Sequence, residues 1–198
     1  EQAAHLGHAS AQFNLGTMYE SGNGVDRSFE KMMEYYTLAA SQKHERGMKK
    51  LAKFDSYPFI TACKFGQVEN VKKMLEDDDI DININESWDE KGWTALLVSC
   101  EEGHANIVAE LLTVNEIDVN QLNVQGVCPL YKACEKNHKD IVELLLSSKN
   151  IDINIKFRDK FTPLMKAQEE GFDEIVHLLT EWKPKEVNVA AVLQTVAD

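Results

Sequence analysis

The residues best suited to chemistry lie in the stretch GVCPLYKACEKNHKDIVELLLSSKNIDINI, which runs from Gly126 to Ile155. It contains two cysteines, Cys128 and Cys134, and one histidine, His138. Thiolates and imidazoles are common zinc ligands, and a cysteine beside a histidine is a familiar nucleophile and base. The stretch is therefore either a metal or thiol site or one copy of a repeated architecture, and the surrounding elements decide between the two.

The spacing of the cysteines argues against metal and disulfide chemistry. Structural zinc sites pair their ligands two to four residues apart, and the chain has no such pair of cysteines. Cys128 and Cys134 are six residues apart on an expected turn and helix, which suits neither a ligand pair nor a disulfide. We expect no metal, no cofactor and no catalytic residue, because no Ser-His-Asp or Cys-His set lies on a glycine elbow or a strand.

An acidic stretch from Asp77 is a second candidate for ion binding. Asp79, Asp81 and Asn83 alternate there as in a calcium loop. However, Ile84 stands where the sharp turn of that loop needs glycine. The stretch is better explained as part of a recurring sequence motif.

Composition and charge narrow the class of partner. The chain has 198 residues, 43% of them hydrophobic, and a net charge of −12, with +1 on residues 1–53 and −13 on residues 54–198. Such an acidic chain repels phosphate backbones, so nucleic acid and anionic membrane are unfavourable partners and a basic protein surface is favoured. The alternative is that the acidity serves solubility alone. The chain begins at Glu1 rather than at a methionine, so we expect further sequence before it.

Internal repeats organise most of the chain. The segments WTALLVSCEEGHANIVAELL, VCPLYKACEKNHKDIVELLL and FTPLMKAQEEGFDEIVHLLT follow one another at a step of 34 residues. An earlier copy, YPFITACKFGQVENVKKML, precedes them by 37 residues, and we assign the difference to a longer loop, INESWDEKG. A tail motif follows three copies, at Ile80–Asn83, Ile117–Asn120 and Ile151–Asn154.

Each repeat predicts a pair of helices. Thr94 and Thr162 suit a helix N-cap, and Pro163 suits a first turn. The second helix places Ile107, Val108 and their i+4 neighbours on one face. One pair of helices cannot bury its apolar faces alone, so the repeats are expected to stack into a continuous core.

These residues resemble the ankyrin repeat family over about residues 56–182. The resemblance implies four repeats in an all-α solenoid with short β-turn tips, and we expect residues 183–198 to form a C-terminal tail or a capping helix. The family's histidine after Thr-Pro-Leu is replaced at every copy, by Ile60, Leu97, Tyr131 and Met165.

Residues 1–55 follow a different step, of 36 residues, which relates His8 to His44 and Leu15 to Leu51. Together with a glycine turn at Gly22 and the expected helix SFEKMMEYYTLAA, they resemble the Sel-like repeat, a relative of the tetratricopeptide repeat. Fewer than two such units are present. These residues are therefore either the end of a longer array or they bury their apolar faces against the ankyrin-like units. The direct junction LAKFDSYPF predicts a rigid connection.

The repeats also explain the cysteines and histidines. Cys63, Cys100 and Cys134 occupy one position of successive repeats, with Gln168 in the last. We expect them to be small core residues in a reducing compartment, the cytoplasm. His104 and His138 recur at the start of the second helix, where we expect a structural role.

The resemblance implies protein binding through the concave face, which is formed by the tips and the first, inner helices. The expected contact residues are Glu90, Lys91, Trp93, Glu101, Glu102, Gln125, Val127, Glu135, Lys136, Arg158, Asp159, Phe161, Glu169 and Glu170. The glutamates form one acidic column, which favours a basic partner. The alternative to partner binding is that one apolar column only packs each tip against the next; its residues are Trp93, Val127 and Phe161. A further alternative is that the chain is the regulatory arm of a larger enzyme, such as a kinase, whose catalytic domain lies outside this chain.

Overall fold

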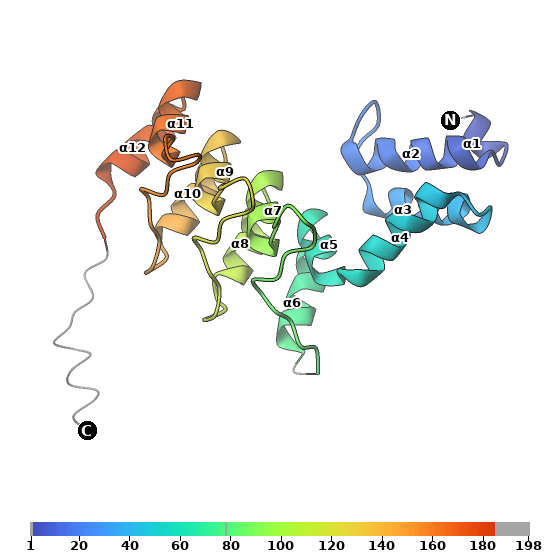
Figure 1. The fold of residues 1–198 in the computed structure, drawn as a ribbon, viewed down its shortest axis with the longest axis horizontal. Coiled ribbons are helices and arrows are strands. Elements are labelled where there is room, and N and C mark those ends of the chain that lie inside the picture. Colours follow the sequence, from blue (N-terminus) through green and yellow to red (C-terminus); the bar gives the residue numbers. More distant parts are fainter. Residues whose placement is uncertain (1, 78, 185–198) are drawn as a thin grey trace. The chain divides into compact units, whose positions relative to one another are not determined.

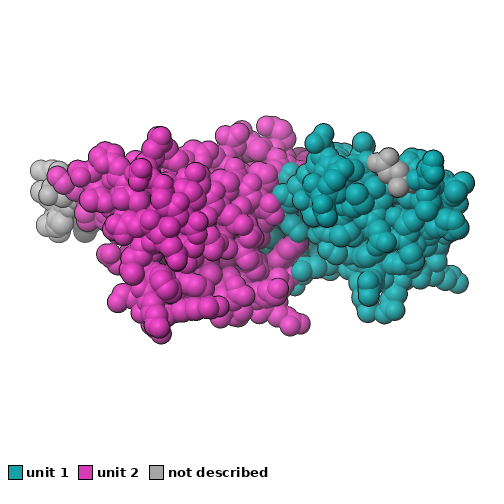
Figure 2. All heavy atoms as spheres, turned by 90° about the horizontal axis from the view of Figure 1, so that it is seen from above, with its two compact units in different colours: residues 1–65 teal, residues 66–198 magenta. Residues whose placement is uncertain are grey.

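The computed structural model describes residues 2–77 and 79–184, which form twelve helices and no named strand (Figure 1). The chain divides into two compact units, residues 1–65 and 66–198 (Figure 2). The described helices confirm the expected all-α class. The C-terminal tail or capping helix predicted for residues 183–198 lies, from residue 185, outside the described residues. No helix among the described residues is both long enough and apolar enough to cross a membrane.

The first unit is a series of helical hairpins. Its helices are α1 (Gln2–His5), α2 (Ala9–Ser21), α3 (Phe29–Ser41), α4 (Glu45–Ser56) and α5 (Pro58–Lys64). Helices α2 and α4 begin after His8 and His44, which are the two histidines related by the 36-residue step. The helices therefore follow that step, whereas the assignment to Sel-like repeats stays a prediction.

Helix α3 packs closely between α2 and α4. A Cβ atom at Gly16 of α2 would lie 2.7 Å from Cδ1 of Tyr36, so the ring of Tyr36 occupies the space that a side chain would need. On the other side, a Cβ atom at Gly47 of α4 would lie 3.2 Å from Cβ of Ala39. The absence of a side chain at Gly16 and Gly47 therefore allows the three helices to approach one another closely.

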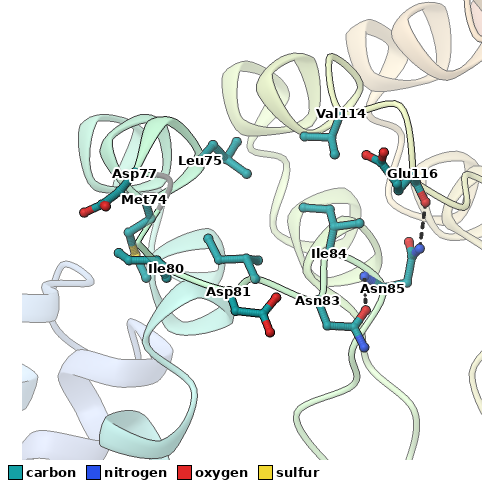
Figure 3. Close-up of a pocket in the computed structure, with 11 residues that line it drawn as sticks. Met74, Leu75, Asp77, Ile80, Asp81, Asn83, Ile84, Asn85, Val114 and Glu116 are labelled. Atoms are coloured by element: carbon teal, nitrogen blue, oxygen red, sulfur yellow. Dashed lines mark hydrogen bonds between the residues drawn. The ribbon is translucent and has the colours of Figure 1, made fainter.

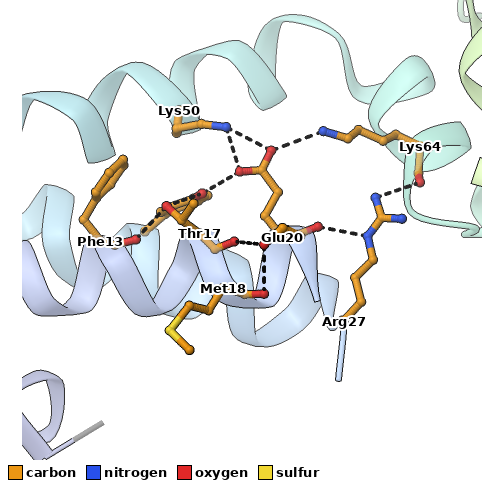
Figure 4. A network of polar contacts seen from close by, with 9 residues as sticks. Phe13, Thr17, Met18, Glu20, Arg27, Lys50 and Lys64 are labelled. Atoms are coloured by element: carbon orange, nitrogen blue, oxygen red, sulfur yellow. Dashed lines mark hydrogen bonds and ion pairs between the residues drawn. The ribbon is translucent and has the colours of Figure 1, made fainter. Parts of the chain in front are cut away.

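One carboxylate joins four helices of this unit (Figure 4). Glu20 of α2 accepts hydrogen bonds from Lys50 of α4 at 2.6 Å and from Tyr36 of α3 at 2.6 Å. Lys64 of α5 pairs with it at 3.2 Å. Burial raises the pKa of Glu20, but the hydrogen bonds from Lys50 and Tyr36 and the charge of Lys64 outweigh burial and bring it to about 2. Helix α5, which the repeat register assigns to the first ankyrin-like copy, is thereby bound to the helices before it.

The second unit alternates inner and outer helices. The inner helices are α7 (Ala95–Glu102), α9 (Pro129–Glu135) and α11 (Pro163–Glu170); the outer helices are α6 (Val68–Glu76), α8 (Ala105–Leu111), α10 (Lys139–Leu146) and α12 (Asp173–Glu181). Inner helices contact inner helices and outer helices contact outer helices along the row (Figure 1). This arrangement confirms the predicted repeat solenoid.

The helix starts follow the sequence prediction with one addition. The hydroxyls of Thr94 and Thr162 accept hydrogen bonds from backbone amides three residues on, each at 3.2 Å, and the thiol of Cys128 does the same between them. His138 begins an outer helix as expected, but its side chain does not cap that helix. The ring of His138 instead lies against Gly103, and a Cβ atom added at Gly103 would come within 2.6 Å of this ring.

The tail motif of the first copy is shifted from the predicted register. Asn85 donates from Nδ2 to the Glu116 carbonyl at 2.8 Å, and its Oδ1 accepts from the Asp118 amide at 2.9 Å. Asn120 repeats this pattern one copy later. Asn85 is therefore the counterpart of Asn120, and the first tail motif is residues 82–85 instead of Ile80–Asn83.

This register also corrects the place of the three additional residues in the 37-residue step. Asn85 lies 17 residues after the first residue of α6, whereas Asn120 lies 15 residues after the first residue of α8. Two of the additional residues therefore fall between the start of α6 and Asn85, where α6 has nine residues and α8 has seven, and only one falls in the INESWDEKG loop to which the sequence assigned all three.

The tips are short turns, as the resemblance implies. Antiparallel bridges join Ser87 to Thr94 and Phe157 to Phe161. The last tip turns through Arg158 and Asp159, whose φ angles are 51° and 57°, in the left-handed region that non-glycine residues seldom adopt. This turn presents both side chains to solvent.

Candidate functional site

The inner helices carry the predicted column of glutamates, and lysines on the same helices form ion pairs with these glutamates. Lys132 Nζ lies 2.6 Å from a carboxylate oxygen of Glu135 and 3.9 Å from one of Glu101. Lys166 Nζ lies 3.1 Å from Glu169 and 2.6 Å from Glu170. The predicted acidic column is therefore interrupted, because lysines are interleaved with its glutamates.

The lysines reduce the charge of this face. Its five glutamates, Glu101, Glu102, Glu135, Glu169 and Glu170, share it with Lys132, Lys136 and Lys166, which leaves a net charge of −2. Lys136 lies 4.0 Å from Glu101. Hydrogen bonds to Glu170 and Glu169 raise the pKa of Lys166, so it stays charged at any physiological pH. The face is moderately acidic and rich in ion pairs.

Sequence reasoning missed Lys132 and Lys166, although a signal for them existed. The two lysines are 34 residues apart, and each precedes a glutamate of the column by three residues, which on a helix is the spacing of neighbouring side chains. The side chain of Lys132 is only 12% exposed. Its Nζ lies 5.5 Å from the ring centroid of Trp93, so this lysine connects a tip to two inner helices.

The tip residues divide by exposure. Glu90, Lys91, Gln125, Arg158 and Asp159 are exposed as expected.

The apolar position that recurs beside the tips is not uniform. Val127 is 4% exposed, which makes it a packing residue, and its amide is hydrogen-bonded to Asn123. Trp93 is half-buried beside Lys132, and Phe161 is 38% exposed. Of these three residues, Phe161 and part of Trp93 are therefore accessible to a partner.

The cysteines are core residues. Cys63, Cys100, Cys128 and Cys134 are buried, and none of them is in a disulfide. Burial raises the pKa of Cys100 well above its usual value and raises that of Cys134 as well, so these thiols remain protonated and unreactive. Among the described residues, no group of three or more His, Cys, Asp or Glu side chains is arranged to hold a metal ion.

The comparisons with known proteins agree with this geometry. A family model described as "Ankyrin repeats" matches residues 36–123, 59–157 and 109–191, which together span more than half of the chain. A segment of 54 residues, 27% of this chain, is 41% identical to "Chitin synthase regulator SKT5" of Saccharomyces cerevisiae. That segment corresponds to only 8% of the length of the yeast protein.

Proposed function

This chain belongs to the ankyrin repeat family, a family of protein-interaction modules, and we propose that it is a scaffold or adaptor whose partner contacts the inner helices and the tips. The observation that carries the proposal is the composition of this face. Exposed charged groups recur over three successive repeats, and they are accompanied by the partly exposed rings of Trp93 in the first repeat and Phe161 in the third. Aromatic anchors surrounded by charged groups are typical of protein interfaces.

We further propose that the partner presents basic side chains to this face. The side chains of Glu169 and Glu170 are 62% and 42% exposed, so their carboxylates can accept further hydrogen bonds while they stay paired with Lys166. A partner arginine would bind such a carboxylate in the bidentate manner. The interleaved lysines restrict the fit: the partner should carry few, well-placed basic groups instead of a long basic run.

The proposal is tested by charge reversal on the inner helices. A partner is first captured with the chain and identified, and it is then titrated against the wild type and against Glu102→Lys/Glu170→Lys. We expect the double variant to weaken binding about tenfold at low salt, since each exposed pair contributes up to about 1 kcal/mol and reversal adds repulsion. The difference should shrink at high salt.

A matched control separates local contacts from total charge. Glu69→Lys/Glu181→Lys changes the net charge equally, but on the outer helices α6 and α12. We expect it to bind nearly as the wild type does. Equal losses for the two double variants would mean that the inner-helix face is not the binding face.

The alternative function is a regulatory arm of an enzyme that lies outside this chain. The relative from yeast is named as a regulator of chitin synthase, which supports this reading for the short matched segment. The reading is tested by adding the chain to the captured partner and measuring whether a catalytic rate changes. We propose the cytoplasm as the compartment because none of the four cysteines is in a disulfide, and fractionation of cells that produce the protein would check it.

A further inference from the structure

A groove opens at the C-terminal end of α6, on elements that do not belong to the inner-helix face (Figure 3). Its volume is about 760 Å³. Leu75 and Val114 lie on its helix side, and the segment 80–85 runs along its other side (Figure 3). Met74 and Ile80 complete an aliphatic lining, and Ile80 is 40% exposed.

The groove is large because the chain departs from its own repeat at this point. Two additional residues lie between the start of α6 and the first tail motif, and α6, whose last turn lines the groove with Met74 and Leu75, is two residues longer than α8. The corresponding groove one repeat later, where that insertion is absent, has a volume of only about 320 Å³. Val114 lines both grooves, so the smaller one continues the larger.

The lining combines aliphatic groups with carboxylates. Asp77, Asp81 and Glu116 are among the lining residues, and no lysine, arginine or histidine is. No basic group of the described residues forms an ion pair with these three carboxylates. The inner-helix glutamates are different in this respect, because lysines already occupy them.

We propose that this groove binds an extended segment of a protein partner in which aliphatic residues alternate with lysine or arginine. Successive side chains of an extended chain point in opposite directions, so alternate aliphatic groups would enter the groove. The intervening long basic side chains would reach back to Asp81 and Glu116 at its edge. The continuation past Val114 suits an extended segment, which spans two grooves, better than a compact ligand.

This docking site is separate from the one proposed on the inner helices, and the test is chosen to distinguish them. The probe is a fluorescein-labelled hexapeptide of alternating leucine and lysine, and its binding is followed by fluorescence anisotropy. We expect saturable binding with a dissociation constant below about 1 mM. Peptides in which glutamate replaces lysine, or serine replaces leucine, should bind much more weakly, because each lacks one of the two matching features.

Variants of the groove then locate the probe. Asp81→Lys/Glu116→Lys should weaken binding about tenfold, and Ile80→Ser should weaken it about threefold without a change of charge. The side chains of Asp81 and Glu116 make no hydrogen bond within the described part of the chain, so the fold should tolerate their reversal. Circular dichroism of each variant checks that point.

The inner-helix variant Glu102→Lys/Glu170→Lys is the matched control, since it changes the net charge equally. We expect it to bind the probe as the wild type does, even where it loses the partner of the inner-helix face. The groove proposal is overturned if both double variants weaken the probe alike, if Ile80→Ser has no effect, or if the leucine–lysine peptide shows no saturable binding up to about 1 mM.

Discussion

Replacing Asn120 with alanine removes two hydrogen bonds that join successive repeats. Its Nδ2 donates to the Asn150 carbonyl at 2.6 Å, and its Oδ1 accepts from the Asp152 amide at 2.9 Å. A neutral hydrogen bond contributes about 0.5–1.5 kcal/mol net, so the pair amounts to about 1–3 kcal/mol. Water can partly replace them because Asn120 is half-buried, and we expect the lower half of that range, about 1–2 kcal/mol.

Two measurements check the Asn120→Ala prediction. Urea unfolding followed by circular dichroism gives the change in the free energy of unfolding. Amide hydrogen exchange gives its location: the Asp152 amide should exchange faster in the variant. The Asp118 amide, which is bonded to Asn85 instead, should be unaffected.

Asn115→Ala is the control for the loss of an amide side chain. Asn115 is exposed, and within the described residues its side chain makes no hydrogen bond. We expect its unfolding free energy to stay within about 0.5 kcal/mol of the wild type. The assignment of the tail motif as a stabilising link between repeats would be refuted by an Asn120→Ala protein that is as stable as this control. It would also be refuted if the Asp152 amide exchanged at the same rate in Asn120→Ala as in the wild type.

Three further predictions concern the core and the first unit. The pKa of Glu20 is lowered to about 2 in the folded protein, so its contribution to stability is fully present above its unfolded pKa near 4.5 and is lost as the pH falls from there to about 2. Between pH 5 and pH 2, the unfolding free energy of the wild type, measured by urea titration, should therefore drop by about 2 kcal/mol more than that of Glu20→Gln. Cys100→Asp should lower the unfolding free energy by about 3 kcal/mol or more, because it buries an unpaired carboxylate. The thiols of the native protein should react slowly with a thiol reagent until urea is added, and rapid labelling of all four in the native protein would contradict their burial. A fragment of residues 1–55 should show no cooperative thermal transition by circular dichroism, because it lacks the Lys64 partner of Glu20 and too few helices remain to bury one another; a cooperative melt would show that the fragment is self-sufficient.

The sequence by itself determined the features that depend on neighbours in the chain. Threonine caps at Thr94 and Thr162 and the apolar stripes of the outer helices act over one or two turns, so the pattern of residues was sufficient to predict helix pairs. The 34-residue step then showed that these pairs repeat. The burial of Cys100 and Cys134 followed from the same step, because one repeat position keeps one environment when repeats stack on both sides.

The tertiary structure decided the features that depend on residues far apart in the chain. Asn83 and Asn85 both follow an isoleucine in an alternating stretch, and only the bonds from Asn85 to the next repeat select the register. Glu101 gains Lys132 from the neighbouring helix, 31 positions away, which no local pattern reveals.

Exposure at equivalent positions was likewise a tertiary property. Val127 is buried and Phe161 is not, although the two occupy the same position of consecutive repeats. The groove at Ile80 depends on two additional residues that lie between the start of α6 and Asn85, whereas the sequence placed them in the INESWDEKG loop. The physical reason is common to all these cases: repeat position specifies the direction of a side chain from its own helix, whereas the neighbouring repeat decides whether that side chain meets a lysine, a core or water.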